Sequence, residues 1–406
     1  MNVAEQIVNQ LVDAGVHRIY GIVGDSLNPI VDAVRKTGGS KKGGIDWIHV
    51  RHEEAAAFAA SAEAQLTGKL AVCAGSCGPG NLHLINGLYD ANRTGAPVLA
   101  IASHIPSVQI GSTYFQETHP DRIFEECSVY NELISSAAQS PRTVNSAIRH
   151  AVGLGGVSVI TLPGDISDLK AVEHVPTYAP ARPATLAPNA TDIEEAAALL
   201  NKADKVAIFA GAGVEGAHDE VIALADALKA PIGHSLRGKH FIQYDNPFDV
   251  GMTGLLGYGA AAEGMNDADV LILLGTDFPY DQFLPGTPTI QVDTHAEKLG
   301  RRTDVGLAIH AQVKPFIEAL LPHLRAGRSD SFLKAKIKKH SEIMHAPVGA
   351  YTRNVEKMRP IHPEYAAHLL NETAAKDAIF TADTGMCNVW TARYIDPLGT
   401  RRLIGS

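Results

Sequence analysis

Two adjacent carboxylates, Glu53 and Glu54, stand at the head of the alanine-rich stretch VRHEEAAAFAASAEAQ. The run IDWIHV before them predicts a strand, and the alanines predict a helix, so both acids fall in the first helical turn. Acidic side chains in that turn interact favourably with the positive end of the helix dipole. The alternative is that one of them takes part in chemistry. The local sequence does not separate these two interpretations.

A glycine pattern, Gly211-x-Gly213-x-x-Gly216, follows the predicted strand KVAIFA. Glycines in that context allow a tight turn and the close approach of a pyrophosphate to a helix N-terminus. The nicotinamide version also has an acid about twenty residues further on. That region reads HSLRGKH here and supplies Arg237 and Lys239 instead. The pattern therefore favours a flavin or another diphosphate over a nicotinamide, and a plain glycine-rich turn remains the alternative.

Three later loops carry residues that suit a flavin site. They are Gly275, Thr276 and Asp277 after a buried strand, Asp293 at the end of TIQVD, and Thr253 with Gly254 in DVGMTGLLG. Ligands of open α/β sheets bind at the carboxyl ends of the strands. Each loop alone has ordinary composition, but their number in one domain indicates a binding site.

Two loops in the first third of the chain are further candidates. The turn GSCGPGNLH contains His83 just inside the next predicted helix, where it faces either a cavity or the core. The glycines and the proline of this turn either contribute to a binding site or only break the secondary structure between a strand and a helix. The long loop around YFQE offers Phe115 and Gln116 as an apolar and an amide wall of a pocket. Cys73 and Cys77 lack a second Cys/His pair at zinc spacing, which argues against a metal site.

Composition places the chain among globular proteins. It has 406 residues, 45% of them hydrophobic, with a net charge of −9 and no long basic block, so no nucleic-acid partner is expected. Four sparse cysteines fit a reduced, cytoplasmic setting. The segment MNVAEQIVNQL predicts an amphipathic helix and not a signal peptide, and no apolar run approaches the roughly 20 residues of a membrane span.

Short apolar runs alternate with helical segments, which predicts doubly wound parallel α/β sheets. Helices are expected over 121–136 and 141–153. The expected organisation is an α/β domain 1–170, a proline-rich linker 171–190, a second α/β domain 191–328, a linker helix 329–357, and the start of a third unit 358–406. About fifty residues cannot close an α/β domain, so the third unit is expected to be incomplete in this chain.

Eight stretches together resemble the thiamine-diphosphate-dependent, FAD-containing pyruvate oxidases, in particular the branch that passes electrons to quinone. They are YGIVGDSLNPI, VRHEEAAAFAA, GSCGPGNLHLINGLYDA, TYFQETHPDRIFEECS, SLRGKHFIQYDNPFDVGMTGLLG, LLGTDFPY, IQVD and FTADTGMCNVWTARY. The likeness covers essentially the whole chain. Acetolactate synthase and benzoylformate decarboxylase share the architecture, but YFQETHP and SLRGK favour the oxidase branch.

The resemblance implies three α/β domains that bind the aminopyrimidine, FAD and the diphosphate in turn. It implies that Glu53 hydrogen-bonds the pyrimidine, which requires a desolvated carboxylate that shares a proton with a ring nitrogen. It places Ser26, His83, Phe115 and Gln116 around thiamine and pyruvate, with Pro79, Thr384, Gly385, Met386 and Cys387 as further thiamine diphosphate contacts. The implied FAD residues are Gly211, Ala212, Gly213, Ser235, Leu236, Arg237, Gly238, Thr253, Gly254, Gly275, Thr276, Asp277, Phe278, Asp293, Asp304 and Val305.

The implied activity is oxidative decarboxylation of pyruvate to acetate and CO₂, with electrons passed through FAD to membrane quinone. The implied assembly is a homotetramer, cytoplasmic and peripheral to the inner face of the cell membrane. The family's Gly-Asp-Gly motif for Mg²⁺ and its membrane-binding C-terminal segment do not occur in these 406 residues. No metal site is therefore expected in this chain, which is expected to be an inactive fragment. The alternatives are an acetolactate-type carboligase, a phosphate- and oxygen-dependent oxidase, and an inactive FAD-binding module that self-associates.

Overall fold

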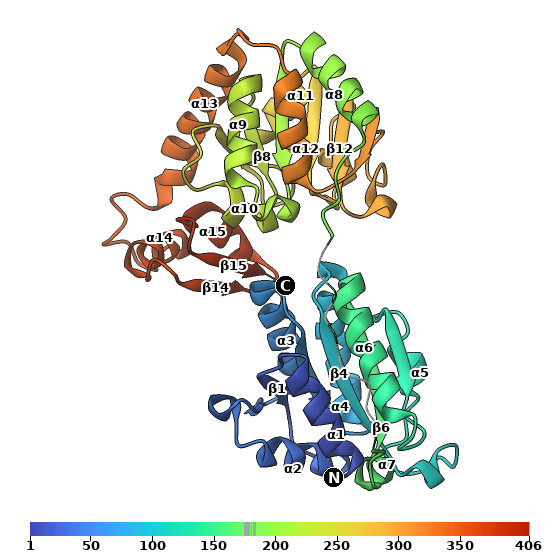
Figure 1. The fold of residues 1–406 in the computed structure, drawn as a ribbon. Helices are drawn as coiled ribbons and strands as arrows, with labels where there is room; N and C mark the ends of the chain where they lie inside the picture. The colour runs from blue at the N-terminus through green and yellow to red at the C-terminus, as the bar shows by residue number, and fades with distance from the viewer. Residues whose placement is uncertain (174–178, 180, 182–183, 406) are drawn as a thin grey trace. The chain divides into compact units, whose positions relative to one another are not determined.

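The structure, a computed structural model, describes residues 1–173, 179, 181 and 184–405 (Figure 1). The chain divides into two compact units, residues 1–182 and 183–406. This division falls within the predicted linker 171–190, of which residues 174–178, 180, 182 and 183 lie outside the described part. Within the described residues, no helix combines the length and the apolar character needed to span a membrane.

The first unit is built on a six-stranded sheet in the order β2-β1-β3-β4-β6-β5, with every neighbouring pair parallel. Its strands are β1 (Arg18–Gly21), β2 (Asp46–His49), β3 (Ala71–Gly75), β4 (Val98–His104), β5 (Tyr130–Leu133) and β6 (Val157–Pro163). Its helices are α1 (Val3–Asp13), α2 (Asn28–Lys36), α3 (Glu53–Thr67), α4 (Pro79–Thr94), α5 (Pro120–Ile123), α6 (Ser140–Leu154) and α7 (Gly164–Asp168).

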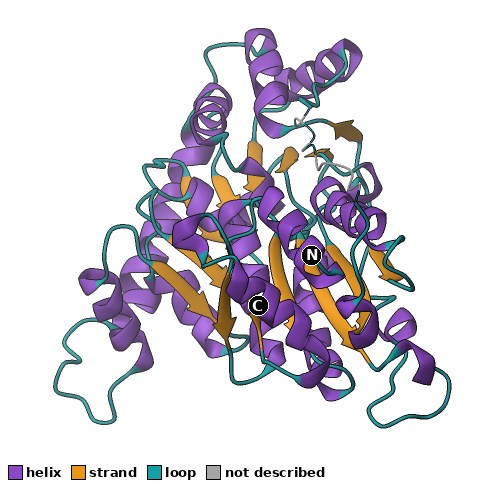
Figure 2. Cartoon of the chain, turned by 60° about the horizontal axis from the view of Figure 1, so that its bottom comes forward, coloured by secondary structure: helices purple, strands orange, loops and turns teal. Residues whose placement is uncertain are grey.

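Helices cover both faces of this sheet, and each face has its own core. Apolar side chains of α1, α2 and α6 form one cluster with the strands, and those of α3 and α4 form another. Figure 2 shows the strands lying between helices. The chain pairs β1 first with β2 and then with β3 on its other side, so the sheet has a topological switch point at β1. The predicted α/β class with doubly wound parallel sheets is confirmed.

One predicted element of this unit is wrong. The segment 121–136 is not a helix, because α5 ends at Ile123 and Tyr130–Leu133 forms the edge strand β5. Tyr130 and the buried Ile134 pack on the core, and the strand pairs in parallel with β6. Pairing with an existing sheet edge overrides a weak local helix preference, and the sequence alone did not reveal this.

The second unit is built on a seven-stranded sheet in the order β10-β9-β8-β7-β11-β12-β13, parallel except for the pair β9–β10. Its strands are β7 (Val206–Ala210), β8 (Ile232–His234), β9 (Asp249–Met252), β10 (Tyr258–Gly259), β11 (Val270–Leu274), β12 (Thr289–Asp293) and β13 (Leu307–His310). Its helices are α8 (Ala190–Lys202), α9 (His218–Leu228), α10 (Leu236–Ile242), α11 (Ala261–Asn266), α12 (Val313–Leu320) and α13 (Ser331–Ile343).

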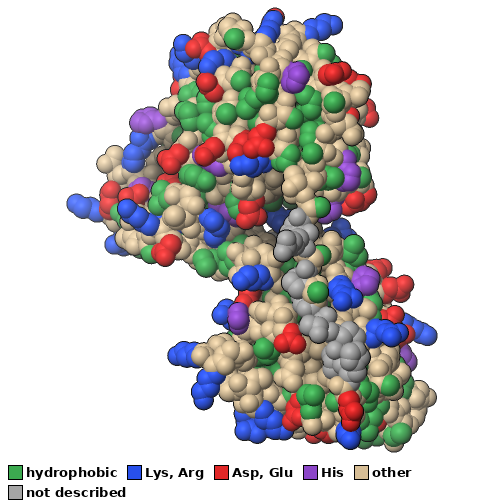
Figure 3. Space-filling model, viewed as in Figure 1, with side chains coloured by type: hydrophobic (Ala, Val, Ile, Leu, Met, Phe, Trp, Pro, Cys, Tyr) green, Lys and Arg blue, Asp and Glu red, His purple; other side chains and the backbone are tan. Residues whose placement is uncertain are grey.

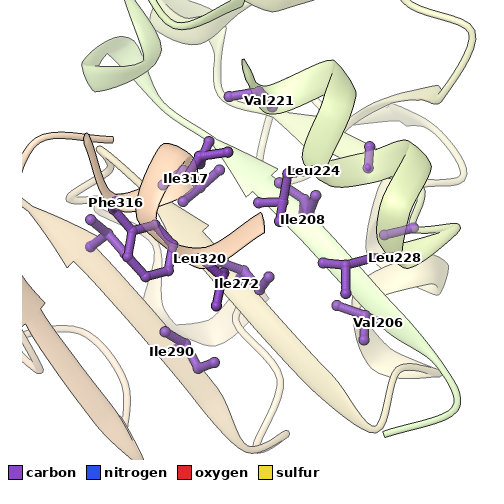
Figure 4. Packing of buried hydrophobic residues seen from close by; sticks show 14 of the residues in the cluster. Val206, Ile208, Val221, Leu224, Leu228, Ile272, Ile290, Phe316, Ile317 and Leu320 are labelled. Atoms are coloured by element: carbon purple, nitrogen blue, oxygen red, sulfur yellow. The ribbon is translucent and has the colours of Figure 1, made fainter. Parts of the chain in front are cut away.

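Figure 4 shows the core on one face of this sheet, where α9 and α12 pack on the central strands. Leu224 and Phe316 are fully buried there, against Ile208 and Ile272. The order of the strands reverses at β7, whose neighbours β8 and β11 lie on opposite sides. A second switch point therefore lies between β7 and β11.

Helix α13 packs on the second sheet as part of this unit. The Lys336 ammonium is buried between the carboxylates of Glu263 on α11 and of Asp267 directly after it, at 2.6 and 2.5 Å. A small parallel sheet follows, made of β14 (Ile379–Ala382) and β15 (Arg402–Gly405) with helices α14 (Pro363–Thr373) and α15 (Met386–Tyr394). These elements fall within the predicted third unit 358–406, and its existence as a separate domain stays a prediction.

Candidate active site

A cavity of about 1000 Å³ opens at the switch point of the first sheet. Segments that follow β1, β3, β4 and β6 line it, together with the start of α3. In a parallel sheet these segments lie at one edge, where the strand carboxyl ends meet. The cavity brings together five residues predicted for the site, namely Ser26, Glu53, Pro79, Phe115 and Gln116.

Glu53 is the first residue of α3 and is only 8% exposed. One of its oxygens, Oε2, lies 3.0 Å from Nδ1 of His83 on α4. A carboxylate only accepts hydrogen bonds, so the histidine nitrogen donates. The other oxygen, Oε1, faces Gly80, where an added Cβ would lie 3.2 Å from it. Glycine at this position leaves room beside the carboxylate.

Glu54 has a different environment. Its Oε1 accepts a hydrogen bond from the Asn86 amide at the surface, and its backbone N–H donates to Nδ1 of His52 at 3.2 Å. His52 is the N-cap of α3, and its ring stacks on that of His83 with 4.2 Å between centroids. Glu54 therefore supports the helix start, and Glu53 is the acid that faces the cavity.

Ser26 belongs to a cluster of hydroxyl groups at the cavity wall. Its Oγ lies 2.9 Å from Oγ of Ser76 and 2.6 Å from Oγ of Ser103, and it accepts the backbone N–H of Cys77 at 3.0 Å. Ser103 is fully buried and also lies 3.2 Å from the carbonyl oxygen of Gly75. One proton and two lone pairs satisfy three partners, so the Ser26 hydroxyl is saturated by the protein itself.

Sequence reasoning missed His104, which is 3% exposed and lines the same cavity. Burial lowers its pKa, and its Nδ1 has no hydrogen-bond partner in the described structure. A buried polar atom without a partner in a cavity wall is a feature of a ligand site. Its place as the last residue of β4 is the signal that predicts it, because that edge of the sheet binds ligands.

The polar side chains that line the cavity suit the pyrimidine part of thiamine diphosphate. Pyrimidine recognition by a shared proton needs a desolvated carboxylate in an accessible cavity, and Glu53 meets both conditions. Among the described residues, no three His, Cys, Asp or Glu side chains converge as a metal-binding group. The predicted role of Mg²⁺ is not tested by this arrangement.

The predicted flavin loops converge at the switch point of the second sheet. Gly211 and Gly213 lie against the loop after β11, and Gly213 N donates to the carbonyl oxygen of Gly275 at 2.9 Å. A Cβ on Gly211 would lie 2.5 Å from that of Thr276. Gly238, in α10, lies equally close to β7, because a Cβ there would be 2.6 Å from the carbonyl oxygen of Ala210, the last residue of β7. These glycines let three loop backbones meet closely.

The loop with Thr253 and Gly254 joins this cluster through Phe278. Gly254 has φ of +90°, and a Cβ there would lie 2.7 Å from the Phe278 ring. Thr253 is 3% exposed, and its hydroxyl has no partner in the described structure. The buried hydroxyl and the close backbone packing fit a ligand whose polar edge lies along these loops. Ala212 forms the short 3-10 turn after Gly211.

Other predicted flavin residues have partners within the protein. Ser235 caps α10 through the Gly238 N–H, with Leu236 and the exposed Arg237 in its first turn. Asp277 pairs with Arg301 and Arg302. Asp293 ends β12, where it accepts the backbone N–H of His295 at 2.9 Å.

Asp304 and Val305 do not join these loops. They precede β13, and Gly306 N donates at 2.9 Å to the carbonyl oxygen of Thr289, the first residue of β12. They therefore lie at the amino ends of parallel strands, opposite the other candidates. Their predicted contact with the flavin stays a prediction. The residue at the carboxyl end of β13 is His310, whose Nε2 lies 3.0 Å from the Thr294 carbonyl oxygen.

Thr384, Gly385, Met386 and Cys387 lie between β14 and α15 in the second unit. Thr384 N donates to Asp383 Oδ1 at 2.7 Å, and Gly385 has φ of +134°. The loop is exposed and ends at the N-terminus of α15. Its predicted role in holding a diphosphate stays a prediction.

Lys239, which follows the flavin loop, points into the second unit and is 1% exposed. Its ammonium donates to Gln243 and, at 3.3 Å, to the Tyr258 hydroxyl. Burial lowers its pKa to about 8, from 10.5. It is therefore an internal group of the second unit.

Replacing Lys239 by methionine is expected to remove a pH dependence of stability. Between pH 8 and 10.5 the unfolded chain binds more protons at Lys239 than the folded one, so the free energy of unfolding rises with pH. The rise is about 3 kcal/mol for one buried group. Urea unfolding of wild type and Lys239→Met across this range measures it. Lys338→Met, at a side chain that is 80% exposed, is the control and should keep the wild-type dependence of the unfolding free energy on pH. The same dependence in Lys239→Met would contradict the lowered pKa of Lys239.

Two doubly wound α/β units, each with a glycine-rich loop at the switch point of its sheet, define an α/β protein of the class whose ligands bind at strand carboxyl ends. Sequence models of the thiamine pyrophosphate enzymes match both units. The N-terminal TPP binding domain matches residues 1–123, and the central domain matches residues 193–320. The chain belongs to the thiamine pyrophosphate enzyme family.

Relatives agree with this assignment. YdaP of Bacillus subtilis, by its name a thiamine pyrophosphate-containing protein, is 36% identical over 96% of this chain and 67% of its own length. Pyruvate oxidase of Lactiplantibacillus plantarum is 29% identical over 98% of this chain and 66% of its own length. A 42.6 kDa protein from the isoamylase 3′ region of Pseudomonas amyloderamosa is 54% identical over 82% of this chain and 84% of its own length. Acetolactate synthases are also among the relatives. The chain thus spans about two thirds of the length of pyruvate oxidase.

Proposed function

We propose that this protein takes part in the oxidative decarboxylation of pyruvate to acetate and CO₂, with FAD as the internal electron acceptor. The observation that carries the proposal is the buried Glu53 carboxylate at the cavity wall, held by His83 at 3.0 Å. The thiamine family assignment and the pyruvate oxidase relative support the substrate class. Motifs YFQETHP and SLRGK support the oxidase branch.

Thiamine diphosphate, when bound, supplies the electron sink that lets a 2-keto acid lose CO₂. Glu53 would hold a proton toward the pyrimidine nitrogen, and Oε1, which faces Gly80, is the oxygen that His83 does not occupy. The hydrogen bond from His83 keeps Oε2 occupied and fixes the plane of the carboxylate. Phe115, which is 78% exposed and lines the cavity, offers an apolar surface to a bound substrate.

The second unit is proposed to hold FAD along the loops of Gly211, Gly254 and Gly275. The unpartnered Thr253 hydroxyl and the converging glycines support this placement. Quinone as the final acceptor, a homotetramer, and a cytoplasmic location at the inner face of the membrane complete the proposal on the strength of the motif resemblance. Acidic and basic side chains are interspersed on the face drawn in Figure 3.

The test is anaerobic reduction of bound flavin by pyruvate in the purified full-length protein, supplied with thiamine diphosphate and Mg²⁺. Loss of the oxidised flavin absorbance, followed by reoxidation on adding a soluble quinone, is the expected result. Flavin that stays oxidised under these conditions would refute the proposed activity. Reoxidation by oxygen with acetyl phosphate formation would assign the phosphate-dependent branch instead.

A second candidate is a carboligase of the acetolactate type, which the acetolactate synthase relatives favour. In that enzyme class the flavin is not reduced during turnover. Acetolactate formed from pyruvate while the flavin stays oxidised would assign this activity. Flavin bound without thiamine affinity and without either product would indicate a binding module.

A further inference from the structure

Cys77 connects two loops of the candidate active site. It is 8% exposed and lines the cavity. Its backbone N–H donates to Ser26 Oγ at 3.0 Å, and its thiol donates to Gln116 Oε1 at 3.4 Å. Cys77, in the loop after β3, therefore bonds to Ser26 in the loop after β1 and to Gln116 in the loop after β4.

The backbone of Gln116 is held in an unusual conformation beside this cysteine. Its φ is +65°, a region that a residue with a side chain occupies at a cost. Gly78 makes the close approach possible, because a Cβ there would lie 2.9 Å from Cβ of Gln116. The backbone is thus fixed, but the side chain is exposed. Among the described residues, the bond to Cys77 is the only hydrogen bond that orients its amide.

The direction of that bond decides what the amide presents to the cavity. A thiol has one proton to donate, and the amide oxygen accepts it, so the NH₂ group turns away from Cys77. The cavity is also lined by Asp25, Asp165 and Asp168. An anionic substrate in such surroundings needs N–H donors to offset nearby carboxylates.

We propose that Cys77 is a positioning residue that orients the Gln116 amide, so that its N–H groups meet the carboxylate of a 2-keto acid. This inference rests on the proposed function for its substrate. It does not assign Cys77 any contact with substrate or any redox step. According to this inference, substrate affinity depends on the proton that the Cys77 side chain donates and not on the volume of that side chain.

Two variants separate the donor from the volume. In Cys77→Ala the donor is lost, and we expect KM for pyruvate to rise about fivefold with kcat within about twofold, as loss of one neutral hydrogen bond implies. Cys77→Ser keeps a donor and should restore KM to within about twofold of wild type. Cys127→Ala, in the buried core where its thiol lies 3.6 Å from the Phe124 carbonyl oxygen, is the control and should leave KM unchanged.

Crystal structures of the wild type and of Cys77→Ala test the positioning without any activity. One conformer of the Gln116 side chain is expected in the first and several in the second. A single, unchanged conformer in Cys77→Ala, or a Cys77→Ser variant with the KM of Cys77→Ala, would overturn the inference. A full-length wild type that fails to turn over pyruvate in the presence of thiamine diphosphate and Mg²⁺ refutes the proposed function, whereas the conformer comparison still decides the role of Cys77.

Discussion

Replacing Glu53 by glutamine is expected to lower kcat for pyruvate by about 10²–10⁴-fold, the range over which a positioned proton-transfer group acts. The amide has nearly the shape of the carboxylate, and its oxygen still accepts the hydrogen bond from His83. The fold should therefore survive, but the amide cannot share a proton with a ligand nitrogen. Steady-state kinetics with saturating thiamine diphosphate measure the loss, and thermal unfolding checks that the protein is intact.

Glu54→Gln is the matched control, because the two acids are adjacent in sequence and differ in surroundings. Glu54 bonds Asn86 at the surface, and removing its charge costs about 0.5 kcal/mol of helix stabilisation. Its kcat should stay close to that of wild type. Equal losses in the two variants would show that the acids act through the helix start, and full activity in Glu53→Gln would remove the carboxylate from the chemistry.

The contrast between these acids shows where sequence reasoning stops. The sequence predicts a strand, a helix and two acids in the first turn, and all of these are present. Which acid faces the cavity depends on the angle at which α3 leaves β2 and on how α4 packs against it. Gly80 and His83 on α4 define the environment of Glu53, and their contact with it is a tertiary fact that no local pattern contains.

Three of the errors share a physical origin at the edges of the sheets, where β5, β10 and β13 lie, and the fourth, β9, lies beside the edge strand β10. The strand β5 was predicted as helix, and β9, β10 and β13 were not predicted. Short edge strands carry few apolar residues and form because a neighbouring strand offers hydrogen bonds. Asp304 and Val305 were placed with the flavin residues by the resemblance alone, and they lie just before the unpredicted β13. The central strands are long buried apolar runs, and the sequence predicts them directly.

Replacing Gly211 by alanine is expected to destabilise the second unit by about 3 kcal/mol, at the upper end for overpacking of a well-packed site. Gly211 follows β7 with ordinary, negative φ, so the cost is steric and not conformational. The new methyl would lie 2.5 Å from Cβ of Thr276 and would overlap the carbonyl oxygen of Gly275. Gly211 N also donates to the Leu274 carbonyl oxygen at 2.9 Å, so the two loops cannot separate without losing that bond.

Gly216→Ala distinguishes this steric effect from the general loss of a glycine in the same motif. Gly216 has φ of +71°, and a Cβ there would have nothing within 4 Å, so only the left-handed backbone costs energy, about 1 kcal/mol. Urea unfolding should therefore rank wild type above Gly216→Ala and Gly216→Ala above Gly211→Ala. If the proposed flavin lies along these loops, Gly211→Ala should also lose bound flavin, while Gly216→Ala retains it. Equal destabilisation by the two variants would mean that the motif needs glycine for its backbone conformation. It would contradict the interpretation that Gly211 is needed for the close contact between the loops after β7 and β11.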